Sequence, residues 1–267
     1  MSSVPALLRR DSAVVVAALA VLVLLAWLYV WRGAGMGMSA SDMTLLTLFP
    51  HTQVEPMPGM AAPPYSWLVS LTMWWVMMIA MMTPSAAPLV LLYSRVQQHS
   101  AAHSTGVSYA SPLLLVSGYL IAWLGFSLLA TALQYGLQRA ELISPMMLWS
   151  KSKWLSAAVL VSAGLYQYSP FKQACLKHCR GPVDFLLRHS RPGRWGALTM
   201  GLEHGSWCIG CCWVLMLLLF IGGVMNLVWI ALLTSLVLVE KLAPSGVATT
   251  RVSGAVLIVW GLVTLLV

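Results

Sequence analysis

The sequence contains very little charge. Charged residues make up 8% of its 267 positions, and only seven of these residues are Asp or Glu. An ordinary soluble domain carries about 25% charged residues, so this chain has too few to cover a surface that faces water. Hydrophobic residues make up 60% of the chain, and the mean hydropathy is +0.83. These values exclude a soluble globular enzyme and a disordered or collagen-like chain.

Several common motifs are also missing. The sequence has no internal repeat, no coiled-coil heptads and no Gly-rich nucleotide-binding motif, so an ATP-driven pump is not expected. A net charge of +8 would be compatible with a nucleic-acid partner in a soluble protein. In an apolar chain the fifteen Lys and Arg are better explained as topology signals, and no nucleic acid is expected. The residue types that are unusual in number or position are Met (16), Trp (13) and Cys (5), the last confined to a short stretch.

Long apolar runs predict an all-α fold, a polytopic transmembrane helix bundle of about seven spans, with six or five as alternatives. The expected spans are residues 13–31, 66–82, 112–135, 154–168, 196–221, 224–240 and 252–267. Pro84 and Pro170 are expected to end the second and fourth spans. We expect the first span to be retained as an anchor. The chain then divides into residues 1–65, an N-terminal anchor helix and a Met-rich outer loop, and residues 66–267, a metal-binding-type membrane helix bundle.

The basic residues predict the orientation of this bundle. With a cytoplasmic N-terminus, eleven Lys and Arg fall in inside segments and four in outside segments, which agrees with the positive-inside rule. The expected location is the bacterial cytoplasmic (inner) membrane. The basic segment 170–195 would then face the cytoplasm, and the loop 33–65 would face the exterior. Glu240 and Lys241 are expected to pair with each other at the membrane interface.

A stripe of soft ligands lies at the start of the fifth span. Helical spacing places His204, Cys208, Cys211 and Cys212 on one face. Thiolates and imidazole suit Cu(I), zinc or iron–sulfur chemistry. Gly205 and Gly210 leave room for a neighbouring helix or an ion, and Glu203 is costly inside hydrocarbon. The alternative is that these cysteines are small packing residues. A single stripe rarely closes a metal site, so other helices would have to contribute ligands.

Two further groups extend this pattern. Cys175, His178 and Cys179 lie within about one helical turn, and Lys177 and Arg180 are expected to lower the pKa of these thiols. The alternative is a helix end with incidental thiols.

In the second span Met73, Met77 and Met81 form one row, with Met78 and Met82 in another. The outer loop adds Met and His, at Met36, Met38, Met43, His51, Met57 and Met60. Met77 and Met81 could relay a soft ion or could simply pack.

These residues carry a resemblance to a known family. The matching positions include Met78, Met81, Met82 and Pro84; Gly118, Tyr119 and Trp123; Tyr166, Gln167, Pro170, Lys172, Cys175, Cys179 and Pro182; Gly201, His204, Gly205, Cys208, Gly210, Cys211, Cys212 and Trp213; and Gly223, Asn226, Glu240 and Lys241. From Ser66 to the C-terminus the chain resembles the bacterial predicted metal-binding integral membrane proteins, a domain-of-unknown-function family sometimes labelled copper chaperone. The resemblance implies a membrane protein that binds metal.

The leading hypothesis is that the chain binds or relays Cu(I), with zinc as a second metal. The expected ligands are His204, Cys208, Cys211, Cys212, Cys175, His178, Cys179, Met77 and Met81, supported by Glu203, Gly205, Gly210 and Asn226. No catalytic residue is assigned, and a non-enzymatic role is favoured. The alternatives are a metal-containing membrane oxidoreductase or monooxygenase-like subunit and a non-catalytic assembly subunit of a larger membrane complex. Expected partners are the lipid bilayer and either membrane complex partners or metal donor or acceptor proteins.

Overall fold

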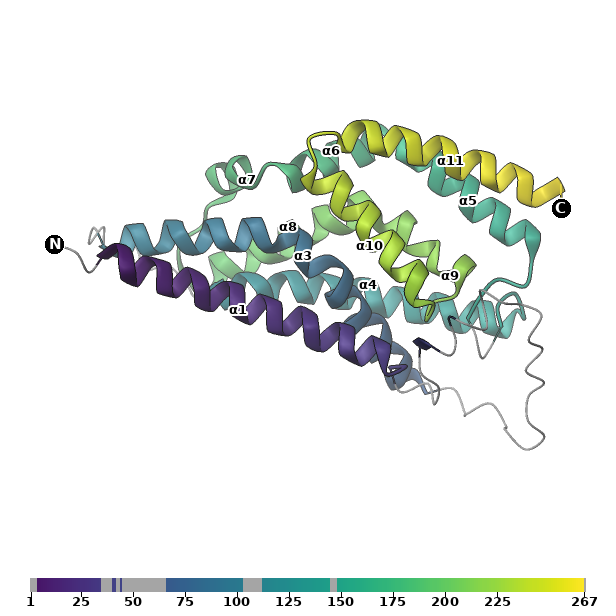
Figure 1. Cartoon of the computed structure of the whole chain (residues 1–267), viewed down its shortest axis with the longest axis horizontal. Helices are drawn as coiled ribbons and strands as arrows, with labels where there is room; N and C mark the ends of the chain where they lie inside the picture. Colours follow the sequence, from purple (N-terminus) through teal and green to yellow (C-terminus); the bar gives the residue numbers. More distant parts are fainter. Residues whose placement is uncertain are drawn as a thin grey trace.

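The computed structural model describes residues 4–34, 40–41, 44, 66–102, 112–144 and 148–266. These residues are mostly helical and contain no strand beyond an isolated bridge between Ile143 and Ser150. The helices are α1 (Val4–Trp31), α3 (Trp67–Ala102), α4 (Pro112–Arg139), α5 (Lys153–Gln167), α6 (Pro170–Arg180), α7 (Pro182–His189), α8 (Gly193–Leu217), α9 (Leu219–Gly222), α10 (Leu227–Leu242) and α11 (Gly246–Leu266). In Figure 1 the long helices lie side by side in an elongated bundle.

Five of the predicted spans are confirmed as long apolar helices. The stretches that are long and apolar enough to cross a membrane are Ala13–Trp31, Trp67–Gln98, Pro112–Arg139, Gly193–Gly222 and Gly246–Leu266. The other two predicted spans correspond to α5 and α10, which have 15 and 16 residues. A full crossing needs about 20. The all-helical class is therefore confirmed, while the count of about seven spans is not.

The prediction that Pro84 ends the second span is wrong. Helix α3 continues through Pro84 and Pro88 to Ala102. Helices in an apolar bundle tolerate internal proline because the neighbouring chain compensates for the hydrogen bonds that are lost. Close to Pro84, the Met82 carbonyl accepts hydrogen bonds from Ser85 Oγ at 2.8 Å and from Tyr119 Oη at 2.9 Å. The helix therefore continues beyond both prolines.

Helices α4 and α8 pack backbone against backbone because glycine lies at their crossing. A Cβ atom on Gly201 would meet the Leu115 carbonyl, and one on Gly118 would meet the Leu198 carbonyl. Further along the same contact, Gly205 lies against Ala122. Residue numbers therefore rise together in the two helices, so α4 and α8 run parallel. The segment between them must return the chain to the starting end of the bundle.

The remaining contacts fix the other directions. Helix α3 runs antiparallel to α4. Near the start of α3, Trp74 Nε1 donates to Gln134 Oε1, late in α4, at 2.6 Å. Further along α3, the Met82 carbonyl accepts from Tyr119, which lies early in α4. Helix α5 runs antiparallel to α11, with Gly164 against Gly254 and Val161 against Gly261. Helices α5, α6 and α10 each contact α8.

Candidate metal centre

Helix α6 brings a cysteine to the cysteine stripe of α8. Ser169 caps the start of α6 by accepting a hydrogen bond from the Phe171 amide at 3.2 Å, and Pro170 occupies the first turn, where its missing N–H costs nothing. Gly181 and Pro182 end the helix and begin α7. Helix α6 packs against α8, so residues on its inner face point toward the middle of α8.

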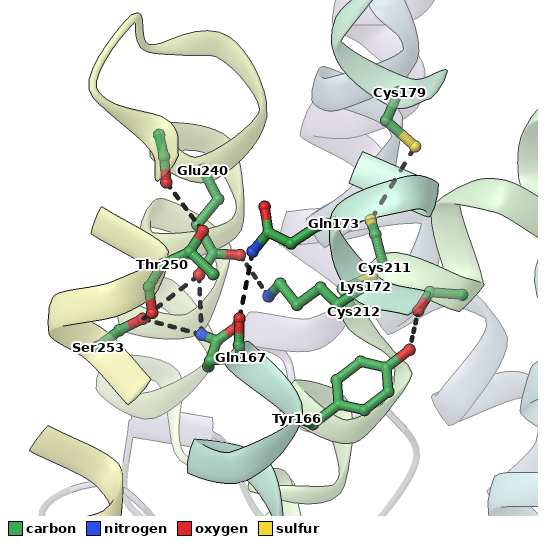
Figure 2. A network of polar contacts seen from close by, with 12 residues as sticks. Tyr166, Gln167, Lys172, Gln173, Cys179, Cys211, Cys212, Glu240, Thr250 and Ser253 are labelled. Carbon is green, nitrogen blue, oxygen red and sulfur yellow. Dashed lines mark hydrogen bonds and ion pairs between the residues drawn. The ribbon is translucent and has the colours of Figure 1, made fainter. Parts of the chain in front are cut away.

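Four thiols gather between these two helices. Cys208, Cys211 and Cys212 are buried on α8, as their spacing predicted. Cys179 of α6 lies with its Sγ 4.0 Å from Cys211 Sγ (Figure 2). The thiols of Cys211 and Cys212 each donate to the Cys208 carbonyl at 3.0 Å. The sulfur cluster is thus built from two helices.

A thioether from a third helix joins this cluster. Met82 Sδ of α3 lies 4.0 Å from Cys212 Sγ, and Met82 is fully buried. Met77 and Met81 are also fully buried in the same core. The methionine that contacts a thiol is therefore Met82, which lies in one row with Met78. The predicted ligands Met77 and Met81 lie in the other row.

Cys208 has two polar neighbours that its helical spacing does not predict. Lys241 Nζ of α10 lies 2.8 Å from Cys208 Sγ, and Tyr119 Oη of α4 lies 3.2 Å from the same sulfur. The expected pair of Glu240 with Lys241 is wrong. Consecutive helix residues do not face each other, and the two side chains turn to different partners. Lys241 was detectable in the sequence as a charge within an apolar segment, but its partner was not.

Glu240 belongs to a separate buried network. Its Oε2 pairs with Lys172 Nζ at 2.7 Å, and its Oε1 accepts from Gln167 Nε2 at 2.8 Å. Ser253 of α11 bonds to both Gln167 and Glu240, at 2.8 and 3.4 Å. Figure 2 shows this network beside the thiols, joining α5, α6, α10 and α11. It holds α6 in place and so fixes the position of Cys179.

His204 lies one turn before Cys208 and is almost completely buried, with 3% of its surface exposed. Its ring lies 6.0 Å from the Tyr119 ring and 5.2 Å from the Phe185 ring, measured between centroids. Among the described residues Nδ1 has no hydrogen-bond partner. A buried polar atom without a partner is costly, so this nitrogen is available to a ligand.

A comparison with protein families bears on these sulfur and imidazole groups. A family described as copper chaperone matches residues 71–264. The chain belongs to this family. The match confirms the resemblance found in the sequence, and it covers the four clustered thiols, Met82, His204 and Lys241. No curated protein and no solved structure matches the chain.

The other predicted site residues have different surroundings. Cys175 Sγ lies against Gly210, where a Cβ atom would be 2.8 Å away. The His178 ring stacks on Trp207 at 4.2 Å, and its Nδ1 contacts the Ala174 carbonyl at 2.9 Å. In this copper chaperone family member, therefore, α6 brings Cys179 to the α8 thiols, while Cys175 and His178 make contacts of their own.

The supporting residues have mainly structural contacts. Glu203 pairs with His189 at 3.2 Å and with Arg191 at 3.7 Å. Gly205 admits the close approach of α4, and the Gly210 carbonyl accepts a hydrogen bond from the Tyr166 hydroxyl. Asn226 caps α10 by accepting from the Trp229 amide at 3.2 Å. The predicted loop ligands Met36, Met38, Met43, His51, Met57 and Met60 lie outside the described residues.

The expected effect of Lys177 and Arg180 on the α6 thiols is wrong. Burial raises the pKa of the Cys175 thiol, and the Cys211 thiol adds to this effect. Hydrogen bonding to Cys208 and Cys211, together with burial, raises the pKa of the Cys179 thiol well above its ordinary value. Arg180 instead donates to the Ala243 carbonyl at 2.6 Å. Both α6 thiols are therefore less acidic than an ordinary cysteine.

The described residues contain no group of three or more His, Cys, Asp or Glu side chains already arranged to hold a metal ion. The sulfur atoms of Cys179 and Cys211 lie 4.0 Å apart, as do those of Cys212 and Met82. Thiolate and thioether donors suit soft ions such as Cu(I), and also zinc and iron–sulfur clusters.

Proposed function

We propose that this protein is a membrane copper chaperone that carries Cu(I) as cargo at the thiols of Cys179, Cys208, Cys211 and Cys212. The observation that carries the proposal is the convergence of four thiols and the Met82 thioether from three helices. Such a set of soft donors is what Cu(I) requires, and the family description agrees with this cargo.

The hydrogen bonds of the cluster explain how it could change on loading. Cys211 and Cys212 hold their sulfur atoms toward the Cys208 carbonyl by donating their thiol protons. Metal binding removes those protons. A thiolate no longer donates to a carbonyl, so each sulfur is free to turn toward the ion. Loss of the proton and formation of the site would then be one event.

The remaining predicted ligands would form a route along which the ion reaches and leaves the thiol cluster. His204, with its unpartnered Nδ1, would take part at the side of the cluster that faces Phe185. Met77 and Met81 would relay the ion along α3. Cys175 and His178 would exchange it with a donor or acceptor protein at the basic side of the bundle. Zinc is the second metal that this set could hold.

We further propose seven crossings of the bacterial inner membrane, with the N-terminus in the cytoplasm. The parallel run of α4 and α8 supports a return of the chain through α5, α6 and α7. Helix α10 would return the chain between α8 and α11 in the same way, since Trp229 bonds to Leu218 and Lys241 contacts Cys208. The cytoplasmic placement of the N-terminus is inferred from the distribution of Lys and Arg alone.

Competition with a chromophoric Cu(I) chelator tests the function. The purified protein is expected to take Cu(I) from the chelator, and the double variant Cys208→Ser, Cys212→Ser is expected to lose this binding. Ser206→Ala on α8 is the matched control, because this exposed side chain bonds to the Leu202 carbonyl of its own helix. Wild-type protein that leaves all the copper with the chelator would refute the proposal, as would a double variant that binds unchanged.

A further inference from the structure

Lys241 is a buried cation placed directly on the thiol cluster. Its side chain is 4% exposed, and its Nζ lies 2.8 Å from Cys208 Sγ and 3.4 Å from Ser85 Oγ. Cys208 is itself 1% exposed. A lysine is almost never buried without a partner of opposite charge. The identity of that partner decides what the lysine does.

The carboxylate next to Lys241 in the sequence is already engaged. Glu240 lies one residue away but pairs with Lys172, which is fully buried, and accepts a hydrogen bond from Gln167. One buried acid therefore faces one of the two buried lysines. The thiol of Cys208 is the acidic group in contact with the other lysine. The positive charge of Lys241 is consequently directed at the sulfur ligands.

We propose that Lys241 is a specificity-determining residue, whose fixed positive charge makes the thiol cluster selective for a monovalent soft metal ion over a divalent one. This inference rests on the proposed function, because it assumes that Cys208 is a ligand. Lys241 does not touch the ion. It acts through the Cys208 sulfur and through its charge.

The physical basis is the interaction of Lys241 with the bound ion. For a given set of thiolate ligands, the attraction between the lysine and the sulfur atoms is the same whichever ion is bound. The lysine repels a divalent ion twice as strongly as a monovalent one, and the low dielectric constant of the interior strengthens this repulsion. The difference favours Cu(I) over Zn²⁺.

The test compares Cu(I), Ag(I) and Zn²⁺ binding to purified full-length protein, by competition with chelators of known affinity. Ag(I) is a monovalent probe without redox chemistry. The variant Lys241→Met removes the charge and retains much of the apolar stem. We expect Cu(I) and Ag(I) affinity to fall roughly 10- to 100-fold, the usual effect of losing a hydrogen bond to a charged group. The affinity for Zn²⁺ should fall less or rise.

Two control variants separate charge from packing. Lys241→Arg keeps the charge and is expected to preserve most of the preference for monovalent ions. Ser85→Ala removes the other polar contact of Nζ and should leave the preference unchanged. In a Cys208→Ser background, Lys241→Met should have a much smaller effect, because the two residues act as a pair.

The outcomes distinguish this inference from the function itself. If wild-type protein binds Cu(I) and Lys241→Met binds Cu(I), Ag(I) and Zn²⁺ with unchanged ratios, the role of Lys241 is refuted and the copper function stands. If wild-type protein binds none of these ions, both are refuted. If Lys241→Met fails to fold, Lys241→Arg still decides, since a loss of the monovalent preference in that folded variant would contradict a role of charge.

Discussion

At the scale of single residues, two lysines and one glutamate are buried among the described residues, and they belong to two different polar clusters. The Lys172–Glu240 pair, with both side chains at most 2% exposed, belongs to a network without sulfur. Lys241 belongs to the thiols. Adjacent residues of α10 thus serve different clusters because they point in different directions from the helix.

This separation predicts the effect of breaking the acid–base pair. Glu240→Gln leaves Lys172 buried without a counter-charge and should destabilise the protein by about 3–5 kcal/mol. The double variant Glu240→Gln, Lys172→Met removes both charges and should recover a large part of this loss. Denaturant unfolding in detergent micelles measures the free energy of unfolding of both variants. Equal instability of the double and the single variant would show that the pair is not the origin of the effect.

At the scale of helices, the position of the thiol stripe depends on the α4–α8 crossing. Gly118 and Gly201 let the two backbones touch, and Tyr119, the neighbour of Gly118, contacts both Met82 and Cys208. A side chain at the crossing would separate these helices. It would also move the tyrosine that links α3 to the thiols.

A matched pair of glycines on α4 tests this dependence. Gly118→Val inserts atoms into the Leu198 backbone and should lower the melting temperature and weaken Cu(I) binding together. Gly125→Val adds the same atoms where a Cβ atom would have open space, so both quantities should stay near the wild-type values. Light scattering on heating and chelator competition give the two readouts. Equal behaviour of the two variants would contradict a close crossing.

At the scale of the whole molecule, the apolar runs were sufficient to predict the helical class, and helical spacing was sufficient to predict that Cys208, Cys211 and Cys212 share a buried face. Contacts between helices could not be predicted in this way. All five methionines of α3 from Met73 to Met82 are fully buried, so periodicity could not select Met82. Lys241 reaches Cys208 only because α10 folds back along α8, an arrangement that no local spacing encodes.

The proposed topology can be tested by labelling on a background in which all five cysteines are Ser. A single cysteine at Lys151 is expected to react with an impermeant maleimide from the exterior. One at Arg191, whose side chain is 55% exposed, should react only from the cytoplasm. If α5 to α7 do not return the chain across the membrane, both positions will react from the same side.

The parallel contact of α4 and α8 has a consequence for the order of assembly during synthesis. Helix α8 cannot reach its place beside α4 until the intervening residues 140–192 have been made and have turned the chain around. The thiols of α6 and α8 then exist before α10, which carries Lys241, has left the ribosome. For that interval the cysteines lack their cationic neighbour. Under the proposed function, Cu(I) that bound in this interval would meet a cluster without Lys241, so we expect loading to follow the insertion of α10.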